Sequence, residues 1–302
     1  MRLPRSAWLG PALTLFVSAA SAQVKGSEPA SVTQTIDGTR MTIEYSRPRA
    51  RGRKELFGGQ VHWGEVWTPG ANRSTTLEIS KDITLNGHPV PKGKYSVWLQ
   101  PRKKGAWTAM LDTNSKRFHT QRPDTSKVPI RFPVEVTKGP FVPTLTWAFE
   151  DLQISGAQLT MHWGRVGVAM DLAVQPTFEL RVAEEVAAPY IGWYDLVVAP
   201  IADTTKSYRV TKGTLRIEYR GGSLWGNLST TFVSKGKEQQ YSYEVILLPN
   251  KDGSFAPGFT LKGELAETSP GAVYEFKRTD GKVTGLEERY NDKLEGTYIR
   301  RP

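Results

Sequence analysis

The most informative absence in this sequence is cysteine, of which the chain has none. No disulfide can form, and no thiolate is available as a nucleophile, an iron–sulfur ligand or a zinc ligand. A lipidated cysteine is excluded for the same reason. The fold must therefore be stabilised by the size of its hydrophobic cores, without covalent cross-links.

Motifs for catalysis and metal binding are also lacking. None of the four histidines stands at an H-x-H or H-E-x-x-H spacing, so a metal site would have to be assembled from distant loops. There is no G-x-S-x-G motif, and the S-x-x-K pattern from Ser234 to Lys237 lies in a lysine-rich polar turn. The sequence predicts no metal, no cofactor and no catalytic residue, and it leaves open whether the protein is an enzyme.

Long apolar runs are missing beyond the N-terminus, so we expect a protein that does not span a membrane. Arg2 and Arg5 precede a short apolar stretch at residues 7–17, and small residues at 20–22 fit an A-x-A cleavage site. We expect residues 1–22 to be a signal peptide, cleaved after Ala22, and the protein to be periplasmic or secreted. A lone membrane anchor is the alternative.

Charge is distributed unevenly along the chain, whose net charge is +10. Residues 23–175 hold 21 basic and 13 acidic side chains, whereas residues 176–302 hold 17 of each. Such a shift in composition indicates two domains. Any attraction to anions is therefore expected in the first domain.

Hydrophobic residues alternate with polar ones along most of the chain. Met41, Ile43 and Tyr45 show this period of two, which is typical of half-buried β-strands. Glycine, proline and Asn-Gly punctuation separates the runs, and few segments favour a helix. We predict an all-β protein, with an antiparallel β-sandwich at residues 23–175, a linker at 176–188 and a small antiparallel β-barrel-like domain of six to eight strands at 189–302.

Four arginines form the first candidate site, which we call the arginine row. Arg47, Arg49, Arg51 and Arg53 are spaced by two, so in an extended segment their guanidinium groups would point to one side. Such a row could bind phosphate, sulfate or carboxylate groups. The favoured alternative is a solvated basic edge that discourages aggregation. Nucleic acid is not expected as a partner, because no aromatic residues are interleaved for base stacking.

Residues 62–73, the tryptophan loop, form the second candidate site. Trp63 and Trp67 could stack on a sugar or another small ligand, with Asn72 and Arg73 fixing its hydroxyl or acidic groups. His62 is the one histidine retained as a candidate ligand-binding residue, and metal ligation there is disfavoured. The alternative is that both tryptophans plug the end of the sandwich.

Several segments of the first domain match a known family in order and spacing. They include Val32 to Ile36, Tyr45-Ser46-Arg47-Pro48, Leu56-Phe57-Gly58-Gly59, Gly64-Glu65-Val66-Trp67 and Gly70-Ala71-Asn72. From about residue 30 to 175 the chain resembles the bacterial family of domain of unknown function 2911. The resemblance implies an exported β-sandwich and no known activity. The family usually has a basic residue after the tryptophan and an acidic one after the asparagine, where this chain has Thr68-Pro69 and Arg73.

The second half carries a weaker resemblance, over roughly residues 188–302. Tyr190 to Tyr194, Leu224-Trp225-Gly226 and the stretch from Phe276 to Leu286 are similar to domain of unknown function 3471. That small β-domain follows β-lactamase-like catalytic domains, and the resemblance implies an accessory role.

Our hypothesis for function is a non-enzymatic binding or envelope-associated protein for an anionic or carbohydrate ligand. A hydrolase of an unrecognised type, acting on an envelope polymer, is the alternative. A hydrolase would need two carboxylates, or a carboxylate and His62, converging in a pocket. The sequence indicates neither the identity of the ligand nor the oligomeric state.

Overall fold

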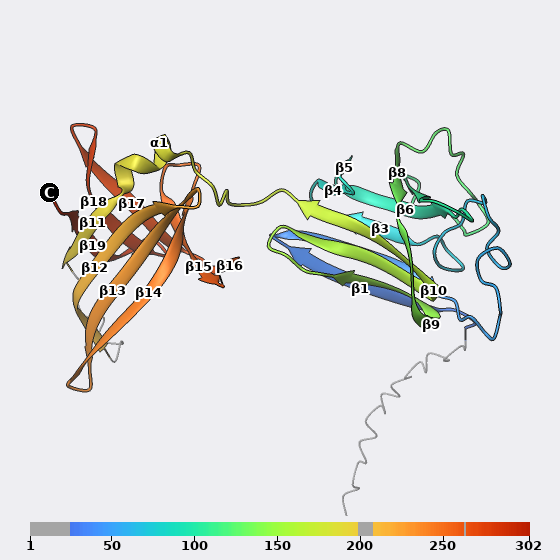
Figure 1. The fold of residues 1–302 in the computed structure, drawn as a ribbon, viewed down its shortest axis with the longest axis horizontal. Helices are drawn as coiled ribbons and strands as arrows, with labels where there is room; N and C mark the ends of the chain where they lie inside the picture. Colours follow the sequence, from blue (N-terminus) through green and yellow to red (C-terminus); the bar gives the residue numbers. More distant parts are fainter. Residues whose placement is uncertain (1–24, 199–207, 263) are drawn as a thin grey trace, which may run out of the picture.

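The computed structural model describes residues 25–198, 208–262 and 264–302 (Figure 1). The expected signal peptide, residues 1–22, lies outside them. The protein is 62% strand and 3% helical, which confirms the all-β prediction. No helix among the described residues is long and apolar enough to cross a membrane.

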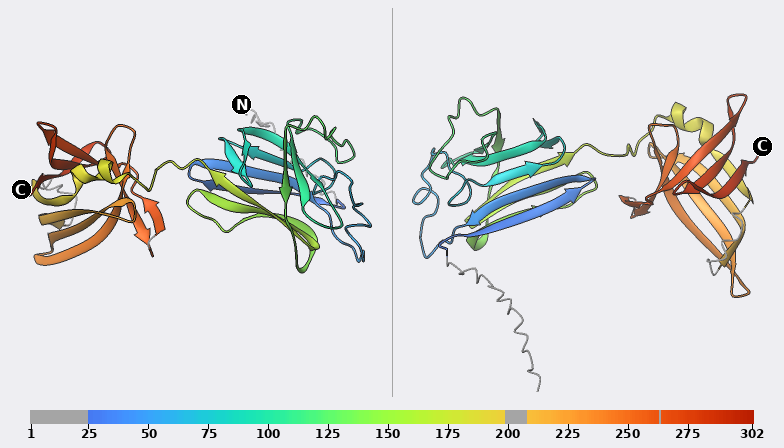
Figure 2. Two further views of the ribbon diagram at one scale, coloured as in Figure 1. Left: turned by 45° about the horizontal axis from the view of Figure 1, so that its top comes forward. Right: turned by 180° about the vertical axis from the view of Figure 1, so that it is seen from behind.

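The first half contains two antiparallel sheets. Six strands form one sheet in the order β1-β2-β3-β6-β7-β8, with bounds Glu28–Ile36, Thr39–Arg47, Thr76–Ile79, Gly93–Gln100, Trp107–Asp112 and Ile130–Val134. Four strands form the other in the order β5-β4-β10-β9, with bounds His88–Val90, Ile83–Leu85, Gly156–Val174 and Val136–Glu150. Figure 2 shows these two layers from further directions.

One hydrophobic core lies between the two sheets, as the period of two predicts. Met41, Ile43 and Leu99 of the six-stranded sheet are fully buried there, together with Met161 and Leu145 of the four-stranded sheet. Residues between them in sequence point to the opposite face of their sheet. Each strand therefore contributes one row to the core and one row to an outer face.

The outer face of the six-stranded sheet is covered over only part of its width. On β6 and β7, Trp98 and Met110 point outward yet are fully buried, because Val128 and the half-buried Val66 pack on them. Next to these strands, Glu44 of β2 and Glu78 of β3 point outward and are exposed. This uncovered part of the sheet is where the candidate site lies.

The second half is a closed eight-stranded antiparallel β-barrel. The ring order is β14-β13-β12-β11-β19-β18-β17-β15, and β15 pairs with β14 to close it, while β16 pairs with β15 outside the ring. The bounds of β11 to β19 are Gly192–Val198, Tyr208–Arg220, Ser223–Ser234, Lys237–Pro249, Phe255–Leu261, Glu264–Thr268, Ala272–Thr279, Lys282–Tyr290 and Lys293–Arg300. The ninth strand, β16, exceeds the six to eight that the sequence predicted.

A short helical segment packs against the barrel core. It consists of α1 (Glu184–Ala187) and a 3₁₀ turn (Ala188–Tyr190). Ala187 is fully buried, and the Tyr190 ring contacts Phe255 and Phe276 with centroid distances of 4.9 and 4.6 Å. The chain passes from β10 to this segment as a single connection (Figure 1).

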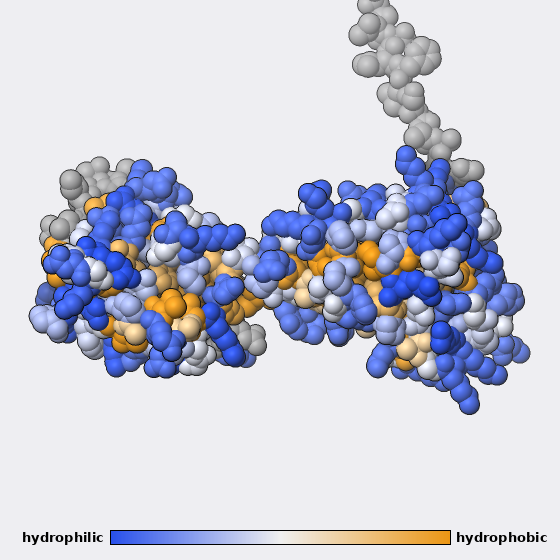
Figure 3. Space-filling model, turned by 90° about the horizontal axis from the view of Figure 1, so that it is seen from above, coloured by the Kyte–Doolittle hydropathy of each residue, from blue (hydrophilic) through white to orange (hydrophobic). Residues whose placement is uncertain are grey.

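The main core of the sandwich and the main core of the barrel share no residue. No strand of β1 to β10 pairs with a strand of β11 to β19. Hydrophobic residues also reach the surface of both halves, as bands between wider hydrophilic areas (Figure 3). The separation of the cores is what two independently folding domains require.

We therefore predict two unfolding transitions. Leu99→Ala in the sandwich and Leu215→Ala in the barrel each remove a fully buried side chain, at a cost of about 2–5 kcal/mol. Scanning calorimetry of the full chain should show each substitution lowering the midpoint of a different transition. A single transition that both substitutions shift would contradict the domain division at residues 176–188.

The barrel should lose stability at alkaline pH. Burial raises the pKa of Tyr194 from 10.0 to about 12, and its hydroxyl donates to the Tyr190 carbonyl at 2.7 Å. The folded state holds this proton more tightly than the unfolded chain. The stabilisation is therefore complete below pH 10 and is lost as the pH rises to about 12.

The measurement is chemical denaturation followed by fluorescence at a series of pH values from neutral to strongly alkaline. We expect a shallower alkaline decline in Tyr194→Phe, because that variant has no hydroxyl to titrate at this position. Equal declines in the two proteins would show that Tyr194 does not contribute.

Candidate functional site

The uncovered outer face of the six-stranded sheet forms a hollow of about 1230 Å³, which we call the basic groove. Among the described residues, seven basic side chains line it against a single carboxylate, that of Glu44. They come from five separate segments of the chain: Lys25, Arg49, Arg51, Arg53, Arg73, Lys94 and Lys116. Part of the excess positive charge of the first half therefore lies in the basic groove.

The floor of the groove consists of outward-pointing strand residues. Lys94 of β6 contacts the carboxylates of Glu44 at 2.5 Å and Glu78 at 3.3 Å. The hydrogen bond from Lys94 lowers the pKa of Glu44, and the bond to Glu44 raises the pKa of Lys94. Both groups are therefore charged at neutral pH and largely neutralise one another.

Three members of the arginine row line the groove, and the fourth does not. Strand β2 ends at Arg47, whose side chain lies on the inner side and donates to the Leu145 carbonyl at 3.2 Å and the Thr146 hydroxyl at 2.9 Å. Beyond the strand, Arg51 has a φ of 51°, in a turn with Gly52. The expected extended row is thus interrupted, because a period of two holds only while the chain remains a strand.

Two of these arginines are held in place by backbone carbonyls. Arg51 donates to the Gly26 carbonyl at 2.7 Å, and Arg53 donates to the Arg49 carbonyl at 3.2 Å. A guanidinium group has five N–H donors, so each side chain keeps donors for a ligand.

Asn72 and Arg73 form another wall of the same groove. Asn72 adopts a φ of 64°, and its amide donates to the Ser27 carbonyl and to the Ser46 hydroxyl, both at 3.3 Å. Arg73 pairs with Phe118 through an isolated β-bridge. These contacts place the end of the tryptophan loop beside the arginine row, a proximity that the sequence did not indicate.

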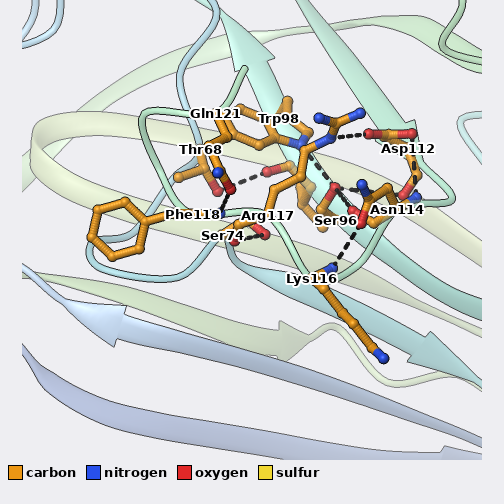
Figure 4. A network of polar contacts seen from close by, with 11 residues as sticks. Thr68, Ser74, Ser96, Trp98, Asp112, Asn114, Lys116, Arg117, Phe118 and Gln121 are labelled. Carbon is orange, nitrogen blue, oxygen red and sulfur yellow. Dashed lines mark hydrogen bonds and ion pairs between the residues drawn. The ribbon is translucent and has the colours of Figure 1, made fainter. Parts of the chain in front are cut away.

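A polar network anchors the segment that follows β7 (Figure 4). The Arg117 guanidinium donates to the carboxylate of Asp112, the last residue of β7, at 2.5 Å, and the Arg117 carbonyl accepts from the Ser74 amide at 3.0 Å. The Ser96 hydroxyl accepts from the Trp98 indole and donates to the Asn114 carbonyl, both at 2.9 Å. The network fixes the backbone that carries Lys116 at the rim of the groove.

The tryptophans of the loop lie away from the groove. Trp67 is half-buried and stacks on the buried Trp163, with ring centroids 5.9 Å apart. Trp63 is 40% exposed, and its ring lies 6.5 Å from that of Trp107. His62 is exposed beside it. Neither tryptophan nor His62 lines the basic groove, so the structure divides the tryptophan loop into two parts.

The middle of the loop is tied to the core by hydrogen bonds. The Thr68 hydroxyl donates to the Val97 carbonyl and accepts from the Thr75 amide, both at 2.9 Å. The indole of the buried Trp147 donates to the Pro69 carbonyl at 3.0 Å. Because Thr68, Pro69 and Gly70 are buried, this stretch sets where Asn72 and Arg73 emerge at the surface.

Lys25, Lys94 and Lys116 are groove residues that the sequence reasoning missed. No local pattern links them, since they are brought together by strand pairing and by the loop after β7. The uneven charge of the two halves was the one signal that pointed towards them.

The fold and the groove define an antiparallel β-sandwich with a basic surface hollow. Residues 27–172 match the family model described as protein of unknown function DUF2911, which confirms the resemblance of this part of the chain to that family. A search of curated proteins found no match. The resemblance of residues 188–302 to domain of unknown function 3471 stays a prediction.

Gly70 offers a test of how the groove wall is positioned. A Cβ at this buried glycine would lie 2.6 Å from the Thr75 hydroxyl, which itself donates to the Pro69 carbonyl. We expect Gly70→Ala to destabilise the sandwich by about 1–3 kcal/mol through overpacking, as measured by urea unfolding.

Gly139→Ala is the matched control, because a Cβ there meets no atom within 4 Å. We expect this exposed substitution to change the free energy of unfolding by at most about 0.5 kcal/mol. Equal effects at the two positions would mean that the loop adjusts freely around residue 70.

Proposed function

We propose that this is an exported protein that binds an anionic ligand in the basic groove. The observation that carries the proposal is the surplus of unpaired cations there. Lys94 is held by Glu44 and Glu78, but none of the other six basic side chains has a carboxylate within ion-pair distance among the described residues. Like charges gathered in one place repel one another, and a bound anion would relieve that repulsion.

The types of side chain support an anion with planar or tetrahedral acidic groups. Four of the six unpaired cations are arginines, whose guanidinium groups match carboxylate and phosphate geometry with two parallel hydrogen bonds. The backbone contacts of Arg51 and Arg53 limit their freedom before a ligand arrives. Less conformational entropy is then lost on binding.

Binding accounts for the groove better than hydrolysis does. No histidine lines it, and its one carboxylate, Glu44, has a lowered pKa. A glycosidase needs a carboxylic acid with a raised pKa to protonate the leaving group. The hydrogen bond and the charge of Lys94 favour the ionised form of Glu44. The described residues of the basic groove therefore give the hydrolase hypothesis no support.

The exported location rests on the pattern at residues 1–22. An envelope or secreted ligand would follow from that location. Mass spectrometry of the protein recovered from its native compartment should find Gln23 as the first residue.

We predict that removing three arginine charges abolishes anion binding. The variant Arg49→Gln, Arg53→Gln, Arg73→Gln keeps polar side chains of similar length at the groove. Calorimetric titration with pyrophosphate, galacturonate and polygalacturonate should show at least one anion binding to the wild type. Its affinity should fall at least about tenfold in the variant, since hydrogen bonds to charged groups contribute about 1.5–3 kcal/mol each.

Arg165→Gln is the control, because Arg165 is an exposed arginine of β10 outside the groove. A neutral maltooligosaccharide serves as the uncharged probe and should bind to none of the proteins. Absence of binding by every anion, or equal losses in the control and the triple variant, would refute the proposed function.

A further inference from the structure

The size of the basic groove exceeds what one small anion would fill. Pockets for small molecules measure about 300–1,000 Å³, whereas the groove measures about 1230 Å³. Its floor crosses β1, β2, β3 and β6, and three steps between neighbouring strands span about 14 Å. A single acidic group would leave most of the surrounding cations without a partner.

The unpaired cations stand around the groove and do not converge on one point. Arg49, Arg51 and Arg53 follow β2, whereas Lys116 lies on the segment after β7, which the network of Figure 4 holds against residues 72–74. The Arg51 guanidinium contacts the Gly26 carbonyl just before the edge strand β1, and strands β2, β3 and β6 lie between β1 and β7 in the sheet. A ligand that meets both groups must carry acidic groups at more than one position along its length.

Hydroxyl and amide groups lie between the cations. Ser31, Ser46 and Thr76 line the floor, while Asn72 and Ser115 line the walls. Hydroxyl groups donate and accept hydrogen bonds, so they can pair with hydroxyl groups of a ligand as well as with its acids. A polyphosphate chain has hydrogen-bond acceptors but no donors. The hydroxyl oxygens and the amide oxygen of the groove, which accept hydrogen bonds, would then have no donor on the ligand.

The groove offers no aromatic surface for stacking. Tyr45 is the one aromatic residue among those that line it, and it is 6% exposed, with its hydroxyl accepting from the Trp147 amide at 3.1 Å. Single-stranded nucleic acids are normally bound by stacking of bases on aromatic side chains. The groove chemistry therefore points away from nucleic acids.

From these observations, and resting on the proposed function, we propose that the ligand is a linear acidic polysaccharide. The chain would lie across the outer face of β1, β2, β3 and β6. Its carboxylate groups would meet the arginines at one side and Lys116 at the other, and its hydroxyl groups would meet the serines and Thr76 between them. Several weak contacts along one polysaccharide chain then add to its affinity for the groove.

The test is a titration with oligogalacturonides of increasing length, from the monomer to the octamer, at constant salt concentration. Joined contacts can exceed a single contact in affinity by 10²–10⁴-fold. We expect the octamer to bind about 100-fold more tightly than the monomer, and a polyphosphate of similar length to bind more weakly than the octamer. Lys116→Gln should weaken binding of the octamer more than that of the monomer.

Lys103→Gln is the matched control, because Lys103 is an exposed lysine outside the groove, and it should change neither affinity. Equal affinities for monomer and octamer would overturn the polymer inference and leave the proposed function in place. Tighter binding of polyphosphate would overturn the assignment of the polymer as a polysaccharide. Failure of every anion to bind would refute the proposed function itself.

Discussion

The structure depends on one constraint, namely that every strand of a sheet has two faces and each face must be buried or hydrated. In the six-stranded sheet the inner rows, such as Met41 and Ile43, pack in the core between the sheets. The outer rows are covered on some strands and exposed on others. Trp98 and Met110 are hydrophobic and are covered, while Glu44 of β2 is exposed and lines the floor of the groove. Val66, which covers Trp98 and Met110, belongs to the tryptophan loop, and the end of the same loop forms one wall of the groove through Asn72 and Arg73.

Much of the fold followed from the sequence, because short-range rules dominate antiparallel sheets. The alternation at Met41 and Ile43 predicted the buried row of β2, and the glycine punctuation between the runs corresponds to turns such as Gly221-Gly222 between β12 and β13. The site was less accessible to such reasoning. The arginine row required that the strand continue beyond Arg47, but whether a strand continues depends on its partners. Nothing in a local pattern joins Arg73 to Lys116, since β-bridge and loop contacts across the fold do so.

The tryptophan loop shows how one segment can serve two purposes. Its first part places Trp67 against Trp163 and belongs with packing, as the plug interpretation anticipated for this residue. Its last part presents Asn72 and Arg73 at the surface. The buried Thr68 to Gly70 stretch between them is hydrogen-bonded to the core, and it sets where the exposed part leaves the core. The loop residues that match the family can therefore contribute to stability, to binding or to both.

In the part of the chain that the structure describes, several arginines of the barrel pair with carboxylates, whereas the arginines of the basic groove do not. On the barrel, Arg216 pairs with Glu218, Arg220 with Glu244, and Arg301 with Asp195. These neighbouring carboxylates neutralise the surface, in agreement with the equal numbers of basic and acidic residues after position 175. In the basic groove the same side-chain type stands without such partners among the described residues. One nearby acid is enough to pair an exposed arginine, and the groove arginines have none among the described residues. Neutral polar residues would hydrate this surface equally well. The proposed ligand therefore explains the unpaired arginines better than solvation alone does.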